Sequence, residues 1–166
     1  MTTLTMLLLT GRGTNGFWGP ATPSYAIFTV GLEVLMGLGL LVGAVLARLH
    51  RFRAHAWCQA SIVLLNVVLI VLVMIPSFQI QVVPRLPERL NKSFYILATI
   101  HAALGTVAEV AGLYLLLAAG TNFLPKPFRL VNYKLWMRAV LASWWVVILL
   151  GIAAYLRWYE PALFGK

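Results

Sequence analysis

Residues 62–75 read IVLLNVVLIVLVMI, a run that contains no charged residue, glycine or proline. With its flanks this run forms an apolar segment from Ala56 to Ile75, which Pro76 ends. Its many β-branched residues would also suit a buried strand. A segment of about 20 residues is too long for a strand, however, and crosses the ~30 Å hydrocarbon core of a bilayer as a helix. The segment therefore predicts a transmembrane helix.

Three further apolar segments of similar length lie on either side of this run, at Tyr25–Ala47, Phe94–Ala119 and Leu135–Tyr155. Because lipid offers no partner to a free backbone amide, each segment is expected to be helical. The short connections force neighbouring helices to run antiparallel. We therefore expect an all-α polytopic membrane protein, an antiparallel up-down four-helix bundle over residues 25–159, with an N-terminal arm and loop at 1–24 and a C-terminal tail at 160–166.

The composition of the chain supports the same class. Of 166 residues, 61% are apolar and 10% are charged, whereas soluble domains contain about 45–50% apolar and about 25% charged residues. The mean hydropathy is +0.89. These values exclude a disordered chain, a charged coiled coil and an ordinary water-soluble enzyme. The sequence also lacks a P-loop, a Rossmann glycine motif, HExxH and CxxC, so we expect a non-enzymatic protein.

The charged residues of the chain are mainly basic, with 13 Lys and Arg against four acids and a net charge of +9. Since the basic residues lie between apolar segments, we interpret them as facing anionic lipid headgroups and not nucleic acid. The first and third connections, with the start of the fourth segment, hold seven basic residues and no acid, whereas the opposite side holds six with two acids. The positive-inside rule then places these connections in the cytoplasm and both termini outside the cell membrane.

Four polar side chains within the apolar segments are the candidate functional residues, namely Glu33, Asn66, His101 and Glu109. Burying such groups costs free energy, which is why they mark sites of interest. Counted from the helix ends, Glu33, Asn66 and His101 lie about 10–14 Å deep and could share one layer. Glu33 with His101 would form either a proton relay or a polar clamp between helices. Glu109 lies deeper and is expected to be neutral, or paired with a partner subunit or cofactor.

The histidines of the chain raise the alternative of a bound haem b. His55 begins the second segment, while His101 lies in the outer half of the third. Their depths differ by about 20 Å, so they cannot ligate one iron together. Met36 could in principle join His101, although we interpret Met36 as packing. A cofactor held by His101 together with a partner protein therefore stays open, and no metal is specified.

Small residues in two of the segments predict close helix packing, either within the bundle or against another subunit. They form two ladders, Gly39–Gly43–Ala47 and Gly105–Ala108–Gly112. In the fourth segment, Trp144 and Trp145 lie at mid-depth, and neighbouring residues of a helix point in different directions. We therefore expect at most one of the two tryptophans to face the centre of the bundle.

Three stretches of the chain resemble the domain-of-unknown-function 420 family of prokaryotic membrane proteins. They are RFRAHAWCQASIVLLNVVLIVLVMIPSF (51–78), FYILATIHAALGTVAEVAGLYLLL (94–117) and YKLWMRAVLASWWVVILLGIAAYLRWY (133–159). The resemblance runs from about Val34 to Tyr159 and rests on the basic loop with His55, on His101 and on the ending around Arg138, Gly151 and Tyr155.

This resemblance implies a four-helix protein of a prokaryotic inner membrane. Some relatives are accessory factors for the maturation of haem–copper cytochrome oxidase. Family histidines near helix ends are suspected metal or haem ligands, and by position they correspond to His55 and His101. Several relatives have a histidine just before the last helix, where this chain has Asn132 and Lys134, which speaks against a site made of several histidines.

The expected function follows from these features. We expect an integral membrane protein that acts through a partner, as a small subunit or assembly factor of a respiratory or electron-transfer membrane complex. One alternative is a haem-b-binding electron-transfer protein, and another is a membrane module that passes protons or a substrate by means of its buried glutamates. Membrane lipids and other membrane protein subunits are the expected partners.

Overall fold

The computed structural model describes residues 23–86, 92–120 and 132–160. Its four long helical stretches begin with α2 (Pro23–Arg48), α3 (Phe52–Leu69), α6 (Ser93–Gly120) and α7 (Tyr133–Tyr159). After α3 the chain continues as a π-helix, η1 (Ile70–Met74), then as α4 (Ile75–Gln81) and as the short 3-10 helix η2 (Val83–Arg85). Residues 1–22 and 161–166, which hold most of the predicted N-terminal arm and C-terminal tail, lie outside the described residues.

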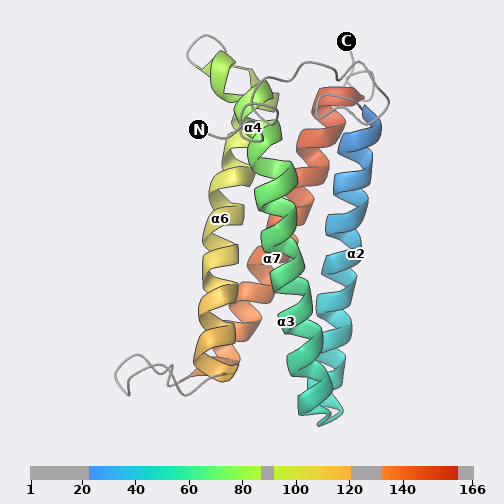
Figure 1. Ribbon diagram of the computed structural model, residues 1–166, viewed down its shortest axis with the longest axis vertical. Helices are drawn as coiled ribbons and strands as arrows, with labels where there is room; N and C mark the ends of the chain where they lie inside the picture. The colour runs from blue at the N-terminus through green and yellow to red at the C-terminus, as the bar shows by residue number, and fades with distance from the viewer. Residues whose placement is uncertain (1–22, 87–91, 121–131, 161–166) are drawn as a thin grey trace, which may run out of the picture.

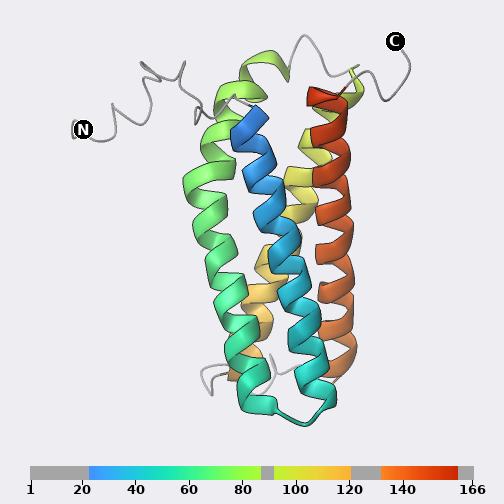
Figure 2. The same ribbon diagram turned by 90° about the vertical axis from the view of Figure 1, so that its right-hand side faces the viewer.

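The helices pack side by side and alternate in direction, as Figures 1 and 2 show. α2 and α3 form one antiparallel pair, α6 and α7 form the other, and α2 packs on α7 between the pairs. One end of the bundle holds the start of α2 and the end of α7, and we call it the Tyr25 end. The other holds the turn between α2 and α3, and we call it the Arg48 end. The predicted antiparallel four-helix bundle is confirmed.

Four helical stretches are long and apolar enough to cross a membrane, at Pro23–Arg48, Phe52–Arg85, Tyr95–Ala119 and Tyr133–Tyr159. Their outward surfaces carry large apolar side chains, with Leu35 63%, Val107 66% and Leu149 59% exposed. Such surfaces are unfavourable in water and match the acyl chains of a bilayer. A small core of Leu40, Val63, Ala108 and Trp144 fills the centre. The chain is therefore a multi-pass membrane protein.

The second membrane-spanning stretch is longer than the sequence predicted, because Pro76 does not end it. The stretch from Phe52 to Arg85 has 34 residues. Within it, the amide of Ile75 reaches back to the carbonyl of Ile70, which makes a wider π-type turn. Pro76 follows in the first turn of α4. Proline is tolerated in a first helical turn, and a neighbouring wide turn relieves the loss of its amide hydrogen bond.

The turn between α2 and α3 is closed by backbone hydrogen bonds alone. Arg51 N donates to Leu46 O (2.9 Å), and His50 N donates to Ala47 O (3.1 Å). This pair of bonds is the Schellman motif, in which the first residue after the C-cap takes a left-handed conformation. That residue is His50, with φ of 58°. The turn thus reverses the chain within three residues, Leu49 to Arg51, and sets α3 against α2.

The first ladder of small residues, Gly39–Gly43–Ala47, lies where α2 packs against α3. A Cβ atom on Gly39 would lie 2.7 Å from Ile62 Cδ1, and one on Gly43 would lie 2.5 Å from Gln59 Nε2. Gln59 Nε2 also donates to Leu40 O (3.2 Å). The predicted close packing is therefore confirmed, and α3 is the helix that occupies this face of α2.

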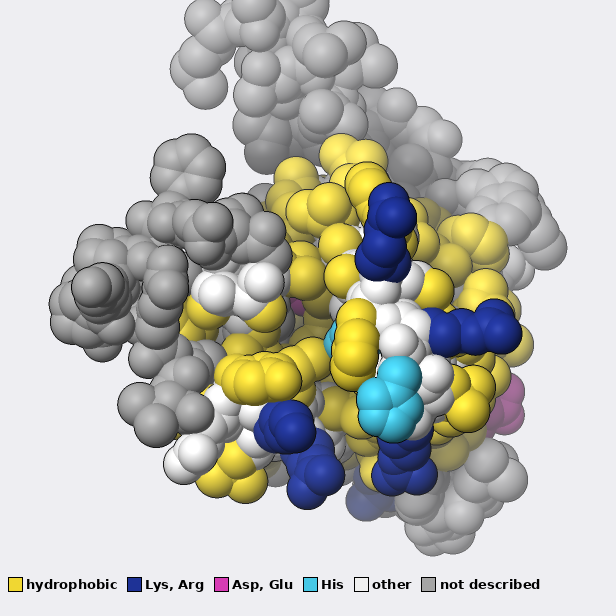
Figure 3. Space-filling model, turned by 90° about the horizontal axis from the view of Figure 1, so that it is seen from below, with side chains coloured by type: hydrophobic (Ala, Val, Ile, Leu, Met, Phe, Trp, Pro, Cys, Tyr) yellow, Lys and Arg dark blue, Asp and Glu magenta, His cyan; other side chains and the backbone are white. Residues whose placement is uncertain are grey.

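Basic side chains gather at the Arg48 end, as Figure 3 shows from below. The exposed basic residues of this end are Arg48, Arg51, Arg53, Lys134 and Arg138. Of the acidic residues that the structure describes, Glu33 and Glu109 are buried inside the bundle, and Glu160 follows the last residue of α7 at the Tyr25 end. Among the described residues, the Arg48 end thus carries exposed basic side chains, and the exposed acid Glu160 lies at the Tyr25 end.

Candidate functional site

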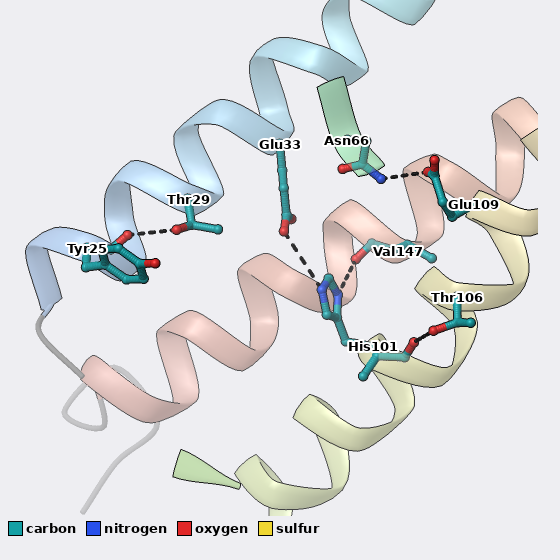
Figure 4. A network of polar contacts seen from close by, with 9 residues as sticks. Tyr25, Thr29, Glu33, Asn66, His101, Thr106, Glu109 and Val147 are labelled. Carbon is teal, nitrogen blue, oxygen red and sulfur yellow. Dashed lines mark hydrogen bonds and ion pairs between the residues drawn. The ribbon is translucent and has the colours of Figure 1, made fainter. Parts of the chain in front are cut away.

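Glu33 of α2 and His101 of α6 face each other inside the bundle, as Figure 4 shows. Glu33 Oε1 lies 3.9 Å from His101 Nε2. The glutamate is only 7% exposed. The pairing expected from their similar depths is therefore present. This separation is within ion-pair range and too long for a direct hydrogen bond, so the two groups interact through charge when the imidazole is protonated.

The other ring nitrogen of His101 is held by α7. His101 Nδ1 lies 3.0 Å from the carbonyl oxygen of Val147. Because a carbonyl oxygen only accepts hydrogen bonds, Nδ1 carries a hydrogen and donates it. Nε2, which faces Glu33, is then the nitrogen that gains or loses a proton. The backbone of α7 thus fixes both the tautomer and the orientation of the ring.

Gly151 of α7 makes room for this pair. A Cβ atom on Gly151 would lie 2.9 Å from Glu33 Oε2 and 2.9 Å from His101 Cε1. Both distances are shorter than van der Waals contact, so a side chain here would displace one of the two groups. Glycine at this position lets the carboxyl group and the imidazole ring lie directly on the backbone of α7.

The second polar contact joins Asn66 of α3 to Glu109 of α6. Asn66 Nδ2 donates to Glu109 Oε2 at 2.8 Å. Asn66 is expected to be able to share one layer with Glu33 and His101, and its side-chain partner is the deeper Glu109. The expectation counted depth from Pro76, whereas the helix continues to Arg85, which places Asn66 further from the end of the helix. Glu109 is expected to be neutral or paired with a partner subunit or cofactor, and among the described residues its Oε2 accepts from Asn66 while its Oε1 has no partner.

A cavity of about 710 Å³ lies between the helices toward the Tyr25 end. All four helical stretches contribute to its largely apolar lining, which includes Glu33, Asn66 and His101. Ser77 of α4 lines it as well. Glu33 Oε2 and Ser77 Oγ are both buried and have no hydrogen-bond partner among the described residues. Two buried polar atoms in an apolar wall thus have no partner within the described bundle.

α4 forms a loosely packed part of the cavity wall. Unlike α3, which packs on α2, α4 makes few contacts with α2, α6 or α7 in the described part of the chain. Figure 1 shows α4 lying apart from the start of α2 at the upper end. At the Tyr25 end the lining includes the aromatic residues Tyr25, Tyr155, Trp158 and Tyr159.

The described histidines do not form a haem site of two imidazoles. His55 Nδ1 donates to Gly43 O (2.7 Å) and so fastens α3 to α2 near the Arg48 end. Gly43 lies ten residues beyond Glu33 on α2, or about 15 Å along the helix, which keeps His55 far from His101. Among the described residues, no three His, Cys, Asp or Glu side chains group closely enough to hold a metal ion.

No protein-family model, curated protein or solved structure matches this chain. The candidate site is therefore defined by its own geometry, which is the Glu33–His101 pair, the cavity beside it and the glycine beneath it. The resemblance to a family of membrane proteins remains a prediction.

Three parts of the site were not predicted from the sequence. They are Gly151, the carbonyl of Val147 and Ser77, and each is an ordinary feature of an apolar helix when the sequence is read alone. For Gly151 there was one usable signal, because a glycine in a membrane helix often marks a close approach. Of the two central tryptophans, Trp144 is buried and its Nε1 donates to Ala108 O (3.4 Å). This agrees with the expectation that at most one of the two faces the centre of the bundle.

Proposed function

We propose that the bundle is a membrane-embedded binding module. It takes an amphipathic molecule from the bilayer into the cavity and exchanges a proton or a hydrogen bond with it through Glu33 and His101. The observation that carries this proposal is the position of a buried acid–base pair in the wall of a cavity of about 710 Å³. This function is the proton- or substrate-passing alternative of the sequence analysis.

The size and lining of the cavity support binding over a purely structural role. Small-molecule sites typically measure about 300–1,000 Å³ and combine apolar walls with a few polar groups. A polar clamp between α2 and α6 would need neither the cavity nor the free Oε2 of Glu33. The sparse packing of α4 against the other helices supports entry from lipid, since a molecule with an apolar body reaches this wall without crossing water.

The test is to identify what the purified protein holds. Native mass spectrometry of the full chain, released from mild detergent, should show a bound small molecule in addition to phospholipid. Ala102→Phe fills a lining position of the cavity and should abolish this adduct. Val107→Phe places the same side chain on the outer face, where the native residue is 66% exposed, and should retain it. An adduct that survives Ala102→Phe contradicts the proposal.

We propose further that this module serves a larger assembly, as a small subunit or assembly factor of a respiratory or electron-transfer complex in a prokaryotic inner membrane. The family resemblance supports this setting. Gently solubilised membranes should give a native-gel band larger than the protein alone, and copurified subunits should be identified by mass spectrometry with an absorbance spectrum of the same sample. A single small species without subunits contradicts this part, while the binding test above stands independently.

The proposed orientation has the Arg48 end in the cytoplasm. It is supported by the exposed basic residues of that end, because basic loops are retained on the cytoplasmic side. In a Cys58→Ser background, a cysteine at Arg51 should resist a membrane-impermeant maleimide in intact cells, and a cysteine at Glu160 should react. The opposite labelling pattern would reverse the orientation.

A further inference from the structure

The charges of the cavity wall suggest what kind of molecule it holds. Of the described residues that line it, Glu33 is the acidic one and His101 the one basic side chain, and none is Lys or Arg. The other titratable side chains of the lining are phenols, Tyr25, Tyr155 and Tyr159. α3 and α4 contribute only uncharged side chains to it. We propose that the cavity binds a lipophilic organic cation, whose charge lies beside the carboxylate of Glu33.

The first support for a cation is the environment of Glu33. The side chain is buried, and its Oε2 has no partner among the described residues. A buried carboxylate requires a countercharge or several donors. His101 meets Glu33 only through Nε2 at 3.9 Å, while its other nitrogen is committed to Val147. A cation in the cavity would supply this countercharge once the carboxyl group of Glu33 has lost its proton.

The second support is the aromatic side chains at the Tyr25 end. Tyr155 and Tyr159 lie with ring centroids 5.3 Å apart, and both line the cavity together with Trp158. Aromatic faces attract cations, and the attraction is stronger when water is excluded. An anionic headgroup, by contrast, would find no Lys or Arg among the described lining residues. A phosphate or fatty-acid carboxylate is therefore disfavoured as the charged group.

The charge balance requires that binding release a proton. Without ligand, one proton resides either on the carboxyl group of Glu33 or on Nε2 of His101, and the pair carries no net charge. When a monovalent cation binds, this proton leaves to water, the pair becomes a carboxylate beside a neutral imidazole, and the cation restores neutrality. No covalent bond to the cation forms. This inference rests on the proposed binding function and adds the sign of the charge and the proton exchange.

The experiment uses the full-length protein in an uncharged detergent with tetraphenylphosphonium as ligand. Binding is measured by equilibrium dialysis, and proton release is measured with a pH indicator in weakly buffered solution. We expect about one proton released per cation bound, as the charge balance requires. Glu33→Gln should weaken binding at least about tenfold, because it leaves the cation without its partner, and should abolish the release. Glu160→Gln removes the same charge from an exposed position and should leave both unchanged.

Two further measurements test whether the cavity selects a cation. If Glu33→Gln does not fold, as judged by gel filtration, Ala102→Phe should abolish cation binding instead. Tetraphenylborate has the same shape and the opposite charge, and it should bind at least tenfold more weakly than the cation. Equal binding of both ions, or cation binding without proton release, overturns this inference. If tetraphenylborate alone binds and Ala102→Phe prevents it, the proposed binding function stands and the cation inference fails.

Discussion

Gly151 of α7 lies directly against the carboxyl group of Glu33, so that a methyl group on the glycine would be 2.9 Å from Oε2. The same methyl group would lie 3.2 Å from His101 Nδ1, the nitrogen that donates to Val147. One backbone position therefore controls the spacing of the whole pair, although it has no side chain of its own. Any substitution there has to move Glu33, His101 or α7.

Gly151→Ala is expected to lower the free energy of unfolding by about 1–3 kcal/mol, because it overpacks a buried site. It should also weaken the Glu33–His101 contact and so reduce ligand binding. Gly31 is the matched control, since a Cβ atom there meets nothing within 4 Å. Gly31→Ala should stabilise the helix by up to about 1 kcal/mol. Unfolding in mixed micelles with increasing denaturing detergent measures both, and equal effects of the two variants would contradict this account.

Asn66→Leu is expected to destabilise the protein by about 1–3 kcal/mol, because it removes the hydrogen-bond donor of a buried carboxyl group. Glu109 Oε1 already lacks a partner among the described residues, so the variant would leave both oxygens unpaired. The double variant Asn66→Leu, Glu109→Leu should recover most of the loss, since two apolar side chains need no partner. A double-mutant cycle on unfolding free energies measures this coupling. Additive effects of the two substitutions would show that the contact contributes little.

His50→Gly is expected to stabilise the turn between α2 and α3 by about 1 kcal/mol, because glycine adopts the left-handed conformation without the steric penalty of a Cβ atom. His50 has φ of 58° and its side chain is exposed. Arg48→Gly provides the comparison, since it places glycine in the last helical turn and should lower stability by up to about 1 kcal/mol. Thermal unfolding of both variants in detergent tests the prediction, which fails if His50→Gly is the less stable one.

His55→Ala is expected to lower stability by about 0.5–1.5 kcal/mol through loss of its hydrogen bond to Gly43. Because this contact lies at the Arg48 end, far from Glu33, the variant should bind the ligand of the cavity as the wild type does. Parallel measurements of unfolding and of ligand binding separate the two effects. A loss of binding or of a visible absorption band in His55→Ala would instead indicate that His55 holds a cofactor.

The number, type and direction of the helices could be predicted because they follow from length, hydropathy and short connections. The end of the second helix could not, since its position depended on whether Pro76 breaks the helix. The wider turn at Ile70–Met74 accommodates the proline, and no residue pattern in the sequence predicts such a turn. This one difference of length also changes the depth counted for Asn66, whose side chain contacts Glu109.

The candidate site could be predicted in part. Glu33 and His101 are rare residue types in an apolar segment, so depth alone was enough to pair them. Their surroundings depend on helix rotation, which side-chain packing decides, and the apolar segments have weak preferences for any face. Gly151 and Ser77 therefore became visible only once α7 and α4 had been placed around the pair.

The stretch from Phe52 to Arg85, with its 34 residues, is about 50 Å long, whereas a bilayer core measures ~30 Å. The surplus falls on α4 and η2, which form the loosely packed wall of the cavity. Hydrophobic mismatch then acts on that wall first: a thicker membrane draws α4 into the acyl chains, and a thinner one leaves it among the headgroups. Lipid chain length in reconstituted bilayers should accordingly tune how readily molecules reach Glu33.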